Sequence, residues 1–159
     1  MSPAPPRSLE QRIADTRARL TQPAVDAWVA TASAPNGDRG PQPYLVPLSF
    51  AWIDERAVLA VASASRTARN LVEHGIARIG MGPTRDIVLL DCVVEQVLQV
   101  ADAPRGIGDA YAAQADWDPR EDADDNVYVV MRPERIQAWR ESNELPGRLI
   151  MRDGRWANG

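Results

Sequence analysis

Short apolar runs separated by turn sequences constrain the fold of this chain more than any other feature. Runs of strand length cover residues 28–32, 44–52, 57–62, 76–81, 87–100, 126–132, 136–140 and 148–151, and a turn joins the last of them to 155–156. Turn signals such as Asn36-Gly37 and Asp153-Gly154 separate consecutive runs. The pattern predicts hairpins, including one of 44–52 with 57–62. Six or more strands joined in this way indicate a mainly β fold, a small antiparallel barrel with helical attachments.

Three segments are predicted to be helices: residues 8–21, 66–74 and 106–115. The first begins at Ser8, with Gln11 three positions later as in a capping box. The second has Ser65 or Thr67 as its N-cap and ends at Gly75. One predicted helix therefore precedes the strands, and the other two lie between them.

The basic residues exclude several kinds of chemistry. All 18 are arginine, and the chain of 159 residues contains no lysine. A Schiff-base lysine and a phosphate-loop lysine are therefore excluded, and with them covalent pyridoxal-phosphate catalysis and ordinary nucleotide hydrolysis. Cys92 is the single cysteine and His74 the single histidine, so a structural zinc site within one chain lacks its usual ligands and we expect no metal.

Charge and organisation narrow the partners and the location. The 22 acidic residues outnumber the basic ones and give a net charge of −4, which disfavours nucleic acid and acidic membranes as partners. Residues 1–10 contain no apolar run, and no segment reaches the length of a bilayer, so we expect a cytoplasmic protein. We expect one domain over 1–159: a tail and helix in 1–22, a barrel core in 24–140 and a C-terminal hairpin in 141–159.

The segment Ser63-Ala64-Ser65-Arg66-Thr67-Ala68-Arg69-Asn70-Leu71 leaves a predicted strand and opens a predicted helix. Free N–H groups and the helix dipole attract anions at such a place. Arg66, Arg69 and Asn70 lie at positions i, i+3 and i+4 of one helix face. Together with the hydroxyl groups of Ser63, Ser65 and Thr67, they are suitable donors to the oxygens of a phosphate. The spacing alone also fits, and rather favours, a solvated helix face with one cap.

Four elements in order resemble the pyridoxamine 5′-phosphate oxidase-like family of flavin and deazaflavin proteins. They are Trp28-Val29-Ala30-Thr31-Ala32, Pro43-Tyr44-Leu45-Val46-Pro47-Leu48-Ser49-Phe50, Thr67-Ala68-Arg69-Asn70-Leu71 and Ala77-Arg78-Ile79. The resemblance covers roughly residues 24–140. It implies a split antiparallel β-barrel of the FMN-binding type that forms a homodimer and binds FMN or the deazaflavin coenzyme F-420 between the two chains.

The resemblance also implies which residues contact the cofactor. The family's phosphate contact maps onto Arg69 and Asn70, with Ser65 and Thr67 just upstream. The strand beside the flavin ring maps onto Pro47, Leu48 and Ser49. Many deazaflavin-binding members have a lysine where this chain has Thr67, so FMN and deazaflavin both stay open.

The sequence thus favours an FMN- or coenzyme F-420-dependent oxidoreductase that transfers a hydride to or from a small organic substrate. No side chain is assigned a catalytic role, because the cofactor carries out the hydride transfer in such enzymes. The alternative is a non-catalytic protein of the same fold that carries a cofactor or another ligand.

Overall fold

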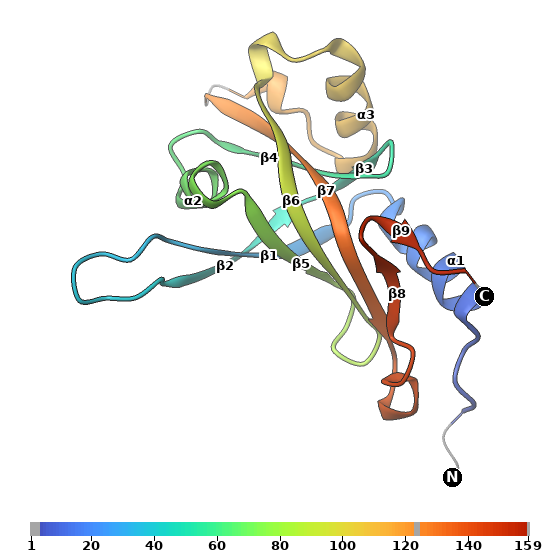
Figure 1. Cartoon of the computed structure of the whole chain (residues 1–159). Coiled ribbons are helices and arrows are strands. Elements are labelled where there is room, and N and C mark those ends of the chain that lie inside the picture. Colours follow the sequence, from blue (N-terminus) through green and yellow to red (C-terminus); the bar gives the residue numbers. More distant parts are fainter. Residues whose placement is uncertain (1–3, 123–124, 159) are drawn as a thin grey trace.

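The computed structural model describes residues 4–122 and 125–158, and an antiparallel sheet of nine strands is its main element (Figure 1). The strands follow the order β2 (Pro43–Ser49), β1 (Asp26–Ala32), β5 (Ile76–Met81), β6 (Ile87–Gln99), β7 (Asn126–Trp139), β4 (Arg56–Ala62) and β3 (Ala51–Ile53). Strand β8 (Leu149–Arg152) pairs with β7, and β9 (Arg155–Trp156) pairs with β8. Within the described residues the outer strands β2 and β3 share no ladder, so the barrel is not closed. The prediction of a mainly β split barrel is confirmed.

The predicted helices are present, and each begins within one residue of the expected start. They are α1 (Leu9–Leu20), α2 (Arg66–His74) and α3 (Arg105–Ala115). Short 3-10 turns, η1 (Val100–Asp102), η2 (Pro119–Glu121) and η3 (Ser142–Glu144), lie between the later elements. The side chain of Ser8 accepts a hydrogen bond from the Gln11 N–H and begins α1. Gly75 ends α2 with a φ of 68°, a backbone conformation in which a glycine is unstrained.

The run 44–52 is not one strand, and the predicted hairpin of 44–52 with 57–62 is wrong for most of its length. Phe50 turns fully into the core and divides the run into β2 and β3. Only β3 pairs with β4, whereas β2 pairs with β1. Pro47 has no N–H to offer a second neighbour, and β2 accordingly lies at the edge of the sheet.

The runs 126–132 and 136–140 were expected to be two strands but form one, β7. Pro133 does not interrupt this strand because it lies opposite Cys92, next to a shift in register between β6 and β7. At such an irregularity a missing N–H removes no regular ladder bond. The acidic run 116–125, expected to be solvated surface, contains η2, and its residues 123–124 lie outside the described residues.

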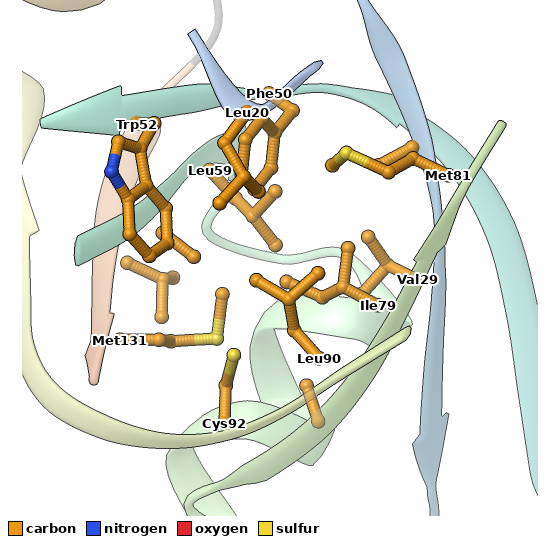
Figure 2. Close-up of a cluster of buried hydrophobic side chains, with 14 of the residues drawn as sticks. Leu20, Val29, Phe50, Trp52, Leu59, Ile79, Met81, Leu90, Cys92 and Met131 are labelled. Atoms are coloured by element: carbon orange, nitrogen blue, oxygen red, sulfur yellow. The ribbon is translucent and has the colours of Figure 1, made fainter. Parts of the chain in front are cut away.

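The main core fills the inside of the barrel. Figure 2 shows side chains from most strands and from α1 meeting there, among them Leu20, Val29, Phe50, Ile79 and Leu90. A second cluster lies under α3, where the rings of Tyr111 and Tyr128 are 5.5 Å apart. No helix of the described residues is long and apolar enough to cross a membrane.

Candidate functional site

Helix α2 begins directly after β4, and it packs against β1, β4 and β6 (Figure 1). The Ser65 hydroxyl accepts a hydrogen bond from the Ala68 N–H at 3.1 Å, and the Ser65 carbonyl accepts one from the Arg69 N–H at 3.1 Å. Among the described residues, the N–H groups of Arg66 and Thr67 have no such partner. The first turn therefore presents two free donors at the positive end of the helix dipole.

Two exposed arginines stand beside these donors. The guanidinium carbon of Arg66 lies 4.9 Å from the centre of the Tyr44 ring on β2. Arg69 donates from Nη1 to the Ala64 carbonyl oxygen at 2.7 Å. Neither arginine forms an ion pair with a carboxylate in the part of the chain that the structure describes, in contrast to Arg78, which is 2.6 Å from Asp91. The start of α2 thus holds two positive charges that no carboxylate neutralises directly.

Thr67 and Asn70 point into the protein instead of towards solvent. Each is only 3% exposed, and the Asn70 amide donates from Nδ2 to the Thr31 hydroxyl on β1 at 2.9 Å. Thr67, Asn70 and Leu71 are spaced i, i+3 and i+4 and form the inward stripe of the helix. Arg66 and Arg69 therefore share an exposed helix face, as predicted. The prediction is wrong for Asn70, whose side chain points inward and fixes α2 to β1.

Both predicted serines already have partners. Ser63 donates its hydroxyl to Asp125 Oδ2 at 2.6 Å and its N–H to the Asp125 carbonyl at 2.8 Å. The Ser65 hydroxyl is the N-cap of α2. These contacts leave the two arginines and the two free N–H groups as the main donors at the start of the helix.

The predicted ring-contact residues lie further along β2. Tyr44, next to Arg66, is near the beginning of that strand, and Pro47–Ser49 follow it by roughly 10–17 Å at the usual rise per residue. Pro47 is exposed, Leu48 packs partly against the core, and the Ser49 carbonyl accepts a hydrogen bond from the Tyr111 hydroxyl at 3.3 Å. A ligand that contacts both the start of α2 and Pro47–Ser49 must therefore be extended.

The outer face of β1, β2 and β5 carries three large exposed apolar side chains. Trp28, Leu45 and Ile76 are 54%, 58% and 61% exposed, and cross-strand register places them on the same face. A hollow of about 500 Å³ opens on this face across β1, β5 and β6.

No group of three or more His, Cys, Asp or Glu side chains suited to a metal ion occurs among the described residues.

Sequence reasoning missed three residues around α2: Tyr44 beside Arg66, Thr31 bonded to Asn70, and Asp125 bonded to Ser63. Thr31 and Asn70 are 39 positions apart, and Ser63 and Asp125 are 62 apart. Local spacing carries no signal for contacts between such distant segments. The pairing of β4 with β7 brings Ser63 to Asp125, and the packing of α2 on β1 brings Asn70 to Thr31.

Comparison with solved structures shows the fold. An F420 reductase is 19% identical over 75% of this chain and 94% of that one, with a TM-score of 0.52. A pyridoxamine 5′-phosphate oxidase-like protein from Listeria innocua is 12% identical over 84% and 100%, with a TM-score of 0.57. A heme-binding protein from Mycobacterium smegmatis is 20% identical over 93% of this chain and 59% of that one, with a TM-score of 0.62. No protein-family model and no curated protein matches the sequence. The likenesses show a split barrel of the FMN-binding type, as predicted.

Proposed function

We propose that this protein binds FMN or the deazaflavin coenzyme F-420 at the start of α2 and along β2, and that it is an oxidoreductase acting on a small organic substrate. The observation that carries the proposal is the pair of exposed arginines, Arg66 and Arg69, beside two unbonded N–H groups. Guanidinium and backbone N–H groups together are the donors that phosphate binding requires. The split-barrel fold supports the choice of a flavin-type cofactor.

The residues present fit such a cofactor in distinct roles. Arg66 and Arg69 would bind its phosphate, and Asn70, through Thr31, holds the helix that presents them. The backbone of Pro47–Ser49 would orient the ring. When bound, the cofactor supplies the hydride-transfer chemistry, and the chain supplies position and charge around it.

Both cofactors stay open under this proposal. The two arginines at α2 suit the phosphate of either molecule, and the net charge of −4 favours FMN over a coenzyme with a polyanionic tail. The arginine-asparagine-leucine element Arg69–Leu71 favours the deazaflavin, because it resembles the deazaflavin-binding branch of the family more than the FMN-binding one. Dissociation constants measured at low and at high ionic strength distinguish the two cofactors. The affinity for the tailed coenzyme should fall more steeply with salt than the affinity for FMN. Tighter binding of FMN at both salt levels would exclude the deazaflavin.

We propose in addition that two copies of the chain associate through the outer face of β1, β2 and β5. The exposure of Trp28, Leu45 and Ile76 supports this, because large exposed apolar patches mark interaction surfaces. The mass in solution should then be twice the 17.5 kDa of one chain. A monomer that still binds the cofactor would contradict a site shared between two chains. The cytoplasmic location expected from the sequence stays a prediction.

A second candidate function is a non-catalytic carrier. A protein with this fold that binds heme supports it, because the fold then serves ligands other than flavins. A turnover assay distinguishes the oxidoreductase from the carrier. Oxidation of a reduced, bound cofactor by an artificial acceptor supports the enzyme. Tight binding without turnover of any acceptor supports the carrier.

The test of the main proposal is the visible spectrum of the purified protein, followed by titration with FMN and with coenzyme F-420. We expect a flavin-type absorption band or saturable binding of at least one of the two. A protein without a chromophore and without binding or thermal stabilisation by either molecule would refute the proposal.

A further inference from the structure

One carboxylate stands at the turn that opens α2. Asp125 lies immediately before β7, and its Oδ2 accepts the hydrogen of the Ser63 hydroxyl at 2.6 Å. The Asp125 carbonyl also accepts the Ser63 N–H at 2.8 Å. An O–H to carboxylate bond of this length is charge-assisted and among the stronger kinds of hydrogen bond. Two bonds therefore hold Asp125 next to the helix start.

The charges around this turn do not cancel. Arg69 reaches the Ala64 carbonyl, one residue from Ser63, yet it forms no ion pair with Asp125. Arg66 is held at the Tyr44 ring on the other side. Two guanidinium groups against one carboxylate leave a single net positive charge at this turn, so the carboxylate cancels part of the attraction that the arginines exert on an anion.

We infer that Asp125 discriminates by the charge of the bound phosphate group and weakens the binding of a doubly charged phosphomonoester more than that of a singly charged phosphodiester. The inference rests on the proposed function, because it needs a phosphate at the start of α2. A phosphomonoester carries about −1.5 to −2 charges at neutral pH, whereas a phosphodiester carries one. Repulsion from a fixed carboxylate grows in proportion to that charge. FMN ends in a phosphomonoester and coenzyme F-420 holds its phosphate as a diester, so Asp125 favours the deazaflavin.

Three ligands with the same ring test the inference: riboflavin, riboflavin 4′,5′-cyclic phosphate and FMN, with no phosphate, a diester and a monoester. Their dissociation constants are measured for the natural protein and for Asp125→Asn by fluorescence titration. A unit charge about 6 Å away in a water-like dielectric changes affinity about threefold per ligand charge. Asp125→Asn should therefore tighten FMN about tenfold and the cyclic phosphate about threefold. Riboflavin affinity should stay the same.

Two further variants complete the design. Asp153→Asn removes the same charge in the β8–β9 turn, where asparagine tolerates the φ of 51°. It should leave all three affinities unchanged. Ser63→Ala keeps the carboxylate but removes its hydroxyl partner, and it should give a smaller gain for FMN than Asp125→Asn gives.

The outcomes separate this inference from the proposed function. If Asp125→Asn changed the affinity for all three ligands by the same factor, or left the FMN affinity unchanged, the selection by charge would be wrong. The proposed cofactor site would not be affected by that result. Absence of binding for all three ligands and for coenzyme F-420, in the natural protein and in both α2-turn variants, would overturn the proposed function and the inference with it.

Discussion

Glu144→Gln should destabilise the protein through one buried ionic contact. Glu144 lies in η3 and is 2% exposed. Its carboxylate accepts hydrogen bonds from the Arg7 N–H at 2.9 Å, from Arg7 Nε at 2.9 Å and from Arg7 Nη2 at 2.7 Å. The Arg140 N–H adds a fourth at 2.8 Å. This carboxylate therefore ties the segment before α1 to the connection between β7 and β8.

The pKa of Glu144 gives the size of the effect. The hydrogen bond from Arg7 is the main cause that lowers this pKa from its ordinary value of 4.5 to about 2. A difference of this size between the folded and unfolded chain corresponds to about 3 kcal/mol of stability at neutral pH. Because the folded pKa lies below the unfolded one, the stabilisation is complete above pH 4.5 and is lost as the pH falls towards 2.

Urea unfolding followed by tryptophan fluorescence measures the free energy of unfolding between pH 7 and pH 2. Glu144→Gln should lower it by about 3 kcal/mol at pH 7, and the gap to the natural protein should narrow below pH 4.5. Glu141→Gln is the matched control. Glu141 is three positions away, pairs with Arg85 at the surface and should contribute little. Equal stabilities of the natural protein and Glu144→Gln, or a difference that does not change with pH, would show that the Arg7–Glu144 contact does not stabilise the fold.

Three further outcomes follow from the described contacts. Asn70→Ala removes the buried partner of Thr31 and should lower the free energy of unfolding by about 1–3 kcal/mol, and an unchanged urea midpoint would contradict this. Cys92 is buried, and burial raises its pKa to about 12, so a thiol reagent at pH 8 should label it only as the chain unfolds; rapid labelling of the native protein would be the contrary result. Ile76→Arg places a charge on the apolar outer face and should convert the proposed dimer to a monomer in sedimentation. A dimer that persists in this variant would contradict an interface on that face.

Elements with local signals could be predicted closely from the sequence. Helix α2 starts after Ser65 and ends before Gly75 as expected, because a hydroxyl cap and a left-handed glycine act within one turn. The break at Phe50 could not be predicted in this way. Val46, Leu48, Phe50 and Trp52 continue one alternating pattern that places Phe50 inside, as observed, but the pattern carries no signal that β2 pairs with β1 whereas β3 pairs with β4.

The candidate site shows the same division. The sequence brings Arg66 and Arg69 to one helix face, and the structure keeps both exposed. The sequence does not indicate that Asn70 turns inward, because this depends on which side of α2 meets β1. Nor does it indicate Asp125, whose place beside Ser63 depends on the pairing of β4 with β7.

The proposed contact of Arg69 with the cofactor phosphate is tested by the affinity of Arg69→Ala for FMN and for riboflavin. Arg69→Ala should lose about 1.5–3 kcal/mol of binding free energy for FMN, the contribution of a hydrogen bond to a charged group. Riboflavin, which lacks the phosphate, should bind both proteins equally. Arg105→Ala, at an exposed arginine on α3, should bind FMN like the natural protein. Equal dissociation constants for FMN in the natural protein and in Arg69→Ala would contradict the account.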